Sequence, residues 1–294
     1  MTTFILEVAV LINIYIILGV SFNLLVGYAG LFSVAHAAFY GIGAYTTALL
    51  MAKLGVNFFL ALALAVVVTA LLSIPLAIPS LRVSGDYLVI ASFGFQLIMS
   101  SVFNNLAITG GAAGLPGIPK PVVFGYRVAG SLPIVALSLG MALLCLGAAW
   151  RVTTSPFGRV LRAIRDDEVA AQSAGKNVQA FKVITFAISA AMAAVAGGLY
   201  GVYVGFISPP SFAVMESFFI FVLVIVGGTG TLRGSVIGAV VLIALPEALR
   251  FVRMPEEVAF PLRQILYAVL VILFMIFRPQ GLLGEQAPRE EQGS

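Results

Sequence analysis

Five long stretches of the chain carry no charged residue, and these stretches limit what the chain can fold into. They are residues 8–52, 54–81, 87–119, 128–150 and 183–215. A helix needs about 20 apolar residues to cross roughly 30 Å of hydrocarbon, so each stretch can hold at least one membrane span. The apolar residues run on without polar alternation, unlike the strands of a membrane β-barrel. The sequence therefore predicts an all-α membrane protein, a polytopic helical bundle.

The predicted bundle has about 8–10 transmembrane helices, some of them broken or re-entrant, in one domain over residues 1–284. One apolar segment, 217–226, is too short to cross alone. The Gly- and Pro-rich segment 104–131 and the segment 206–215 are expected to form outer loops. The polar end, 285–294, is predicted to be a disordered cytoplasmic tail. The remaining expected spans are 4–25, 31–52, 58–78, 87–103, 132–150, 183–204, 234–249 and 264–277.

Charge and cysteine content exclude several other classes of protein. Charged residues make up only 10% of the chain, against about 25% in a soluble domain. The net charge of +4 is explained by basic residues between spans, so nucleic acid is not an expected partner. The single cysteine, Cys145, excludes an internal disulfide and a cysteine-based metal site. No metal ligands are therefore predicted.

Residues 151–182 form the most charged part of the chain, with nine of its 28 charged residues, six of them basic. A charge in hydrocarbon costs at least about 2.5 kcal/mol, so this segment must lie in water between two spans. Its basic residues place it on the cytoplasmic side, which leaves the N-terminus outside. Within it, residues 158–165 can form one short helix and residues 167–174 a second.

The second short helix has recognisable start and end signals. Asp166, Asp167 and Glu168 stand where acids complement the helix dipole, and Asp166 can cap the free N–H groups. Gly175 fits the left-handed position after the helix, and Lys176 adds a favourable charge there. A helix with such small side chains suits a groove on another protein. A solvated connector without any partner is the alternative.

A Val-Gly-x-x-Gly pattern occurs twice, at residues 26–30 and 226–230, each time between an apolar run and a span. Glycine interruptions at corresponding places in two halves often mark helices broken around a transport path. Their backbone N–H and C=O groups can bind a zwitterion without a formal charge in the membrane. Chance is the alternative, because the chain holds 30 glycines. The candidate path residues are Gly27, Gly30, Ser33, His36, Gly227, Gly228 and Gly230.

Ser33 and His36 are three residues apart and would share one face of the expected span 31–52. Such a pair could serve an intramembrane hydrolase, but no carboxylate stands nearby to orient the histidine. Packing or a hydrogen bond between helices is therefore favoured. The carboxylates nearest to spans are Asp86, Glu216 and Glu247. None lies deep within a span, as a proton-coupled carrier would require.

The chain has no phosphate-binding loop of its own. Such a loop needs a glycine, four further residues and then Gly-Lys-Ser or Gly-Lys-Thr. The nearest match, AAQSAGKN, lacks the first glycine and ends in Asn177. This chain is therefore expected to bind no cofactor, and a reaction driven by ATP would use ATP and Mg²⁺ held by a separate polypeptide.

Four further segments accompany the loop 151–182: GLFSVAHAAFYGIGAY (30–45), TGGAAGLPGIP (109–119), GGTGTLRGSVIGA (227–239) and FRPQGLLG (277–284). In this order, over nearly the whole chain, they resemble the M-type permease subunit of branched-chain amino acid ABC importers. The resemblance implies an ABC importer permease fold. It also implies that a Glu-Ala-Ala then Gly signature in the loop docks into an ATP-binding subunit. Ala170, Ala171 and Gly175 match this signature, but Val169 occupies the glutamate position and Glu168 lies one residue early.

The resemblance also implies an assembly in the inner (plasma) membrane. Its parts are two ATP-binding subunits, a second homologous permease and an extracytoplasmic substrate-binding protein. The implied substrates are branched-chain or similar amphipathic amino acids. Urea or short amides, and a secondary carrier, remain as alternatives. The residues expected to couple to the ATP-binding subunit are Arg162, Asp166, Asp167, Glu168, Ala170, Ala171, Gly175, Lys176 and Asn177.

Overall fold

The computed structural model describes residues 2–80, 86–123, 126–128, 130–249, 269 and 282–283. Its α-helices are α1 Thr2–Asn23, α2 His36–Leu54, α3 Phe58–Ser80, α4 Asp86–Asn105, α5 Ser131–Thr154, α6 Pro156–Asp166, α7 Glu168–Ser173, α8 Val178–Val204, α9 Val214–Gly227 and α10 Leu232–Leu249. The shorter elements are the π-helix η1 Leu24–Tyr28, the 3-10 helices η2 Ala107–Thr109, η3 Gly111–Ala113 and η4 Pro209–Phe212, and the strands β1 Leu115–Pro116, β2 Val122–Val123, β3 Tyr126–Arg127 and β4 Phe206–Ile207.

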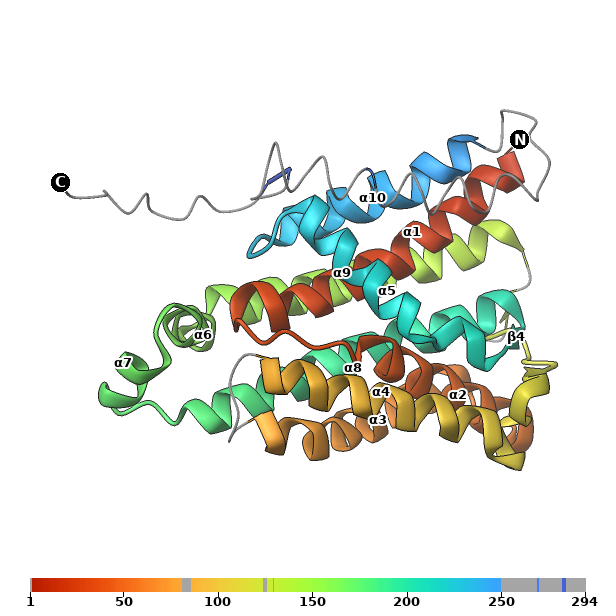
Figure 1. The fold of residues 1–294 in the computed structure, drawn as a ribbon. Coiled ribbons are helices and arrows are strands. Elements are labelled where there is room, and N and C mark those ends of the chain that lie inside the picture. Colours follow the sequence, from red (N-terminus) through yellow and green to blue (C-terminus); the bar gives the residue numbers. More distant parts are fainter. Residues whose placement is uncertain are drawn as a thin grey trace.

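The long helices run side by side, with α6 and α7 at one end of the bundle and β4 at the other (Figure 1). α9 and α10 bend by 117° at the break between them and together make one further candidate span. These helices confirm the predicted all-α polytopic membrane bundle with a broken segment. Within the described residues, the helices long and apolar enough to cross a membrane singly are Thr3–Tyr28, Phe58–Ile78, Tyr87–Asn105, Ser131–Thr154 and Val178–Val204.

α2 and α8 pack backbone against backbone at the centre of the bundle. A Cβ added to Gly43 would lie 2.3 Å from the Ala194 Cα, and one on Gly197 would lie 2.1 Å from the Tyr40 carbonyl oxygen. Both distances are too short for any larger residue. Small residues at helix crossings let apolar helices approach closely in a membrane, where no hydrophobic effect drives them together.

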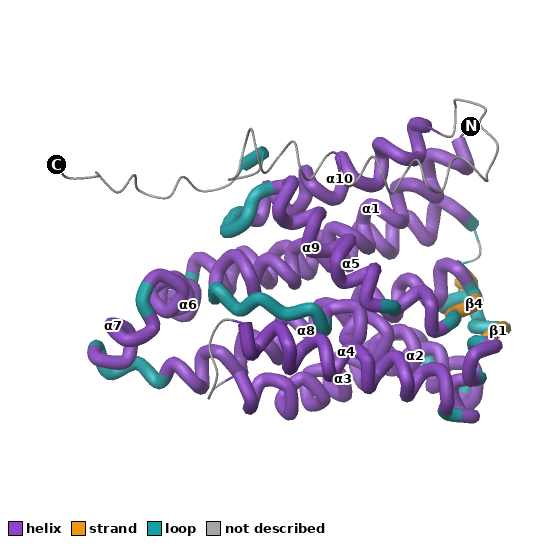
Figure 2. Tube along the Cα trace, in the orientation of Figure 1, coloured by secondary structure: helices purple, strands orange, loops and turns teal. Residues whose placement is uncertain are grey.

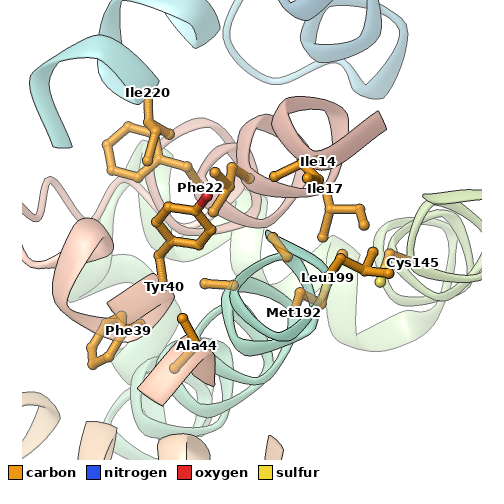
Figure 3. Packing of buried hydrophobic residues seen from close by; sticks show 14 of the residues in the cluster. Ile14, Ile17, Phe22, Phe39, Tyr40, Ala44, Cys145, Met192, Leu199 and Ile220 are labelled. Carbon is orange, nitrogen blue, oxygen red and sulfur yellow. The ribbon is translucent and has the colours of Figure 1, made fainter. Parts of the chain in front are cut away.

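Large apolar side chains fill the space between this central pair and α1. Figure 3 shows Tyr40 of α2 and Leu199 of α8 within the same cluster as Ile14 and Ile17 of α1, all of them buried. α3, α4 and α5 instead turn many leucine, isoleucine and phenylalanine side chains outward, the distribution expected for helices that face lipid or another apolar subunit. Examples of these exposed side chains are Leu60, Leu64, Leu71, Ile90, Phe93, Leu97, Leu139 and Leu143.

Short paired strands and one lysine connect the loops at the end of the bundle opposite α6 and α7. β1 pairs antiparallel with β4, with Leu115 opposite Ile207, so the predicted outer loops 104–131 and 206–215 are joined. β2 pairs antiparallel with β3. Lys120 Nζ donates to the Val202 and Tyr203 carbonyls in the last turn of α8 at 3.0 and 2.8 Å, which places a cation at the negative end of the helix dipole.

The larger differences from the predicted helix boundaries lie around residues 29–35 and at the two ends of the segment 151–182. α1 continues as η1, and α2 begins at His36 rather than near residue 31. Residues 29–35 between them are not helical and run along the bundle ahead of α2 (Figure 2). α5 ends at Thr154 and α8 begins at Val178, so both helices extend into the segment 151–182. The expected span 264–277, apart from residue 269, and the tail 285–294 lie outside the described residues.

Candidate functional site

α6 is set by its own sequence at both ends and along one face. Ser155 caps its start by accepting a hydrogen bond from the Gly158 N–H at 3.4 Å, and Pro156 stands at the first helical position. Leu161 and Ile164 are buried against the bundle, whereas Arg159 is exposed. The predicted amphipathic short helix is therefore present, and it begins slightly earlier than expected.

α7 is a six-residue helix whose start is capped by Asp167, so the predicted cap at Asp166 is wrong. The Asp167 carboxylate accepts from the Val169 and Ala170 N–H groups at 2.9 and 3.0 Å. Asp166 is the last residue of α6, because that helix runs on through Arg165, and its carboxylate turns back to the Arg165 Nε at 3.1 Å. Only the Asp167 carboxylate therefore caps a helix, and Asp166 pairs with the side chain beside it.

α7 ends where the sequence predicted. Gly175 has a φ of +74°, in the left-handed region, and the Lys176 N–H donates to the Ala171 carbonyl at 3.2 Å. Asn177 then caps α8, because its side-chain oxygen accepts from the Ala180 N–H at 3.1 Å. Gly175 and Asn177 therefore both have a structural role, because Gly175 ends α7 and Asn177 begins α8.

An ion pair holds α7 against α8. Lys182 Nζ lies 2.7 and 2.8 Å from the two carboxylate oxygens of Glu168. The Lys182 side chain is only 5% exposed and that of Glu168 35%. Lys182 was expected to lie in the loop but lies inside α8. Glu168, one residue before the signature position, therefore has a partner within this chain, and Ile164, Ala171 and Val178 pack together beneath it.

The opposite surface of α7 is open. Val169, which stands at the glutamate position of the signature, is 71% exposed, and Ala170 is exposed beside it. A groove of about 320 Å³ lies where α6 and α7 meet. It is lined by Pro156, Arg159, Val160, Ala163, Ala171, Ala174 and Lys176. Arg162 lies apart from this groove and reaches back toward the Thr153 carbonyl, with its Nη2 at 3.5 Å from that oxygen.

The two Val-Gly-x-x-Gly segments meet in space. A Cβ on Gly27 would lie 2.4 Å from the Gly230 nitrogen, so the two backbones are in direct contact. Asn23, one turn before Gly27, joins them: its Oδ1 accepts from the Gly230 N–H at 2.9 Å, and its Nδ2 donates to the Thr231 carbonyl at 2.9 Å and to Ser235 Oγ at 2.7 Å. Their role as a path for a zwitterion stays a prediction.

The first glycine segment also contacts α6. Arg165 Nη1 donates to the Gly27 carbonyl at 2.7 Å. Gly30, with a φ of +68°, lies beside the stem of the same arginine, since a Cβ there would be 3.0 Å from Arg165 Cγ. α6 and both glycine breaks are therefore connected through Gly27.

α2 begins inside the bundle, and N–H groups of its first turn donate to side chains of other helices. The Ala37 N–H donates to Ser217 Oγ of α9 at 2.9 Å, and the Ala38 N–H donates to Gln96 Oε1 of α4 at 2.8 Å. Gln96 Nε2 donates to the Phe212 carbonyl at 2.8 Å, just before α9. These tertiary bonds replace the missing helical turn, which is why the break is stable among apolar residues.

Ser33 and His36 do not share a helical face, so that expectation is wrong. Ser33 lies in the non-helical segment, where its Oγ accepts from the Ala35 N–H at 3.3 Å. His36 Nε2 lies 2.8 Å from Ser21 Oγ, which itself donates to the Leu18 carbonyl at 2.9 Å. This contact between helices matches the favoured packing role. The His36 Nδ1 has no hydrogen-bond partner among the described residues.

Among the carboxylates considered, Glu216 of α9 accepts a hydrogen bond from Tyr15 of α1 at 2.7 Å and so joins two helices. The side chains of Asp86 and Glu247 lie outside the described residues. Within the described ranges there is no group of three or more His, Cys, Asp or Glu that could hold a metal ion. The functional contacts that sequence reasoning missed are those of Asn23, Gln96 and Arg165. Each is a polar side chain whose backbone partner is distant in the sequence, and the neighbouring residues do not indicate which backbone group that partner is.

Comparison with known proteins gives a consistent result. Residues 4–277 match the model of the family described as branched-chain amino acid transport system / permease component. The chain is 36% identical to the high-affinity branched-chain amino acid transport system permease protein LivM of Salmonella typhimurium, over 96% of this chain and 71% of that protein. It is 35% identical to LivM of Escherichia coli over the same shares, and 27% identical to LivH of Salmonella typhimurium over 92% of this chain and 91% of that protein. No solved structure matches the chain.

Proposed function

The chain belongs to the permease components of branched-chain amino acid transport systems, and we propose that it is one membrane subunit of an ATP-driven importer in the inner membrane. Its assembly contains two ATP-binding subunits, which bind the ATP and Mg²⁺. A second, homologous permease and an extracytoplasmic substrate-binding protein complete it. The proposed substrates are branched-chain amino acids. The relatives described above support this substrate class, because each of them is named as a permease for branched-chain amino acids.

The observation that carries the proposal is the form of α7. It is a short helix with small exposed side chains at one end of the bundle, next to a groove, and it is anchored from behind by the Glu168–Lys182 ion pair. An anchored surface of this kind can receive a force from a soluble partner and pass it to α8. A connector without a partner would not need a partly buried ion pair, because desolvating the two charges opposes folding.

In the proposed cycle, the ATP-binding subunits hold α6 and α7 of each permease. ATP binding draws these subunits together and carries α6 and α7 with them. The spans then switch between inward-open and outward-open arrangements, a discrete two-state motion. The outer loops that β1 and β4 join receive substrate from the binding protein. Coupling residues sit at the α6–α7 end, and the glycine breaks lie along the transport path.

The test is transport by a reconstituted complex. The chain is purified with its ATP-binding subunits and second permease, placed in proteoliposomes, and supplied with binding protein and radiolabelled leucine. ATP-dependent uptake is expected, with competition by isoleucine and valine but not by urea or acetamide. Uptake by this chain alone, driven by an ion gradient, would make it a secondary carrier. Competition by amides in place of amino acids would change the substrate class.

Docking is tested with two matched glycine substitutions. Gly175 and Gly55 both end helices in the left-handed region, with φ of +74° and +63°, and a Cβ at either would meet nothing within 4 Å. Gly175→Val strains the end of α7 and should lower ATP-dependent uptake at least tenfold while membrane insertion is kept. Gly55→Val imposes the same strain after α2, near Lys53, whose Nζ contacts the Ile108 carbonyl of the segment 104–131. Equal loss in both variants would contradict a specific role for α7.

A further inference from the structure

One contact links the α6–α7 end of the bundle to the membrane helices over a sequence distance of 138 residues. Arg165 lies in the last turn of α6, and its Nη1 donates to the Gly27 carbonyl at 2.7 Å. The arginine stem passes Gly30 so closely that a Cβ there would lie 3.0 Å from Arg165 Cγ. The guanidinium is fixed on a second side by Asp166, at 3.1 Å from Nε.

The chemistry of this contact is that of a helix cap. Gly27 lies in η1, which continues α1, so its carbonyl belongs to the negative end of a long helix. The carbonyls of Leu25 and Val26 accept from the Leu31 and Gly30 N–H groups at 2.9 and 3.2 Å. The Gly27 carbonyl accepts from Arg165 in their place. A hydrogen bond with an ionised donor is about twice as strong as a neutral one, and a cation here also complements the dipole.

The other side of Gly27 is in contact with the turn between α9 and α10. A Cβ on Gly27 would lie 2.4 Å from the Gly230 nitrogen, and the Asn23 side chain bonds both Gly230 and Thr231. α6, η1 and the α9–α10 turn therefore meet around one residue without a side chain. A displacement of α6 beyond the reach of the arginine side chain would break the Arg165 bond or move the backbone at Gly27.

Resting on the proposed function, we propose that Arg165 is a positioning residue that transmits the movement of α6 and α7 to both glycine breaks. The break at Gly27 leads directly into residues 29–35 and then into α2. The break at Gly230 sets how α9 meets α10. One arginine thus connects the ATP-driven end of the subunit to the two places where its membrane helices are interrupted.

The test uses the full complex with Arg165→Gln, and with Arg151→Gln as the matched control. Arg151 is an exposed arginine in the last turn of α5, close to the same end. Three quantities are measured: retention of the ATP-binding subunits on purification, ATP hydrolysis, and leucine transported per ATP hydrolysed. Arg165→Gln should keep subunit retention and ATP hydrolysis within twofold of the unsubstituted complex, and it should lower the leucine transported per ATP at least tenfold. Arg165→Lys keeps a cation able to donate to the same carbonyl, so it should restore the leucine transported per ATP to at least one third of the unsubstituted value.

Two outcomes would overturn the proposal. Arg165→Gln with unchanged transport per ATP would mean that the contact transmits nothing, and loss of the ATP-binding subunits would make Arg165 a docking residue. A second measurement needs no variant. Hydrogen exchange at Gly30 and Leu31 in the unsubstituted complex should change at least fivefold when a non-hydrolysable ATP analogue binds, and no change would contradict the link. Failure of the unsubstituted complex to bind ATP-binding subunits would instead refute the proposed function.

Discussion

The ion pair between Glu168 and Lys182 offers the sharpest test of how α7 is held. Glu168→Ala leaves the Lys182 ammonium without the two carboxylate oxygens that lie 2.7 and 2.8 Å from it. The ammonium belongs to a side chain that is only 5% exposed, in the first turns of α8. We expect α7 to detach from α8 more often, while the membrane helices stay folded.

The size of the effect follows from the burial of the two groups. A hydrogen bond to a charged group contributes about 1.5–3 kcal/mol, and removing one partner of a fully buried pair costs about 3–5 kcal/mol. Glu168 is 35% exposed, so water reaches the pair and the lower range applies. A loss of about 2 kcal/mol corresponds to a roughly 30-fold rise in the fraction of molecules with α7 detached.

The assay is hydrogen exchange at the backbone N–H groups of Ala171 and Ala174, which reports local opening of α7. Exchange in Glu168→Ala should be roughly 30-fold faster. Adding Lys182→Met should recover most of the loss, because no buried charge is then left alone. Asp166→Ala is the control, since that carboxylate is 66% exposed and pairs only at the surface. An exchange rate in Glu168→Ala within threefold of the unsubstituted protein would refute the role given to the pair.

Three further predictions concern the bundle and its orientation. Gly43→Ala places a methyl group against the backbone of α8 and should destabilise the protein by about 1–3 kcal/mol in thermal unfolding in detergent, whereas Gly140→Ala, in open space on α5, should leave the melting temperature unchanged. Gln96→Leu leaves the buried Phe212 carbonyl without its hydrogen-bond donor and removes one of the two acceptors of the Ala38 N–H, at a cost of about 1–3 kcal/mol, and the exposed Asn105→Leu on the same helix should have less than half that effect. A cysteine at Lys176 should react with an impermeant maleimide only from the cytoplasmic side, and labelling from outside would invert the topology.

Much of the fold could be predicted because the membrane imposes length and polarity on each helix. The stretches without charge became long apolar helices, and the 226–230 pattern marked a real break. α6 and α7 could also be anticipated, and Gly175 is a local signal for the end of α7, although α6 begins at Pro156 rather than at the predicted residue 158. The cap was assigned to Asp166 rather than Asp167 because adjacent acids are equally suited, and only the length of α6 decides between them.

The break before α2 could not be predicted, because residues 31–35 have the composition of a span. At the break, the N–H groups of Val34, Ala37 and Ala38 instead donate to the side chains of Ser92, Ser217 and Gln96, which come from other helices. Arg165 was counted among the basic residues of the loop, but its partner lies 138 positions away. Contacts of this kind depend on how helices are arranged in three dimensions, which periodicity does not encode.

The close crossing of α2 and α8 decides how force can travel through the subunit. With Gly43 set against Ala194, no layer of side chains lies between the two helices at the crossing, so we expect α2 and α8 to move together as one rigid unit. The ion pair of Lys182 with Glu168 holds α7 against the first turns of α8. A displacement of the six-residue helix α7 would therefore be passed to α8 and α2 together rather than to α8 alone.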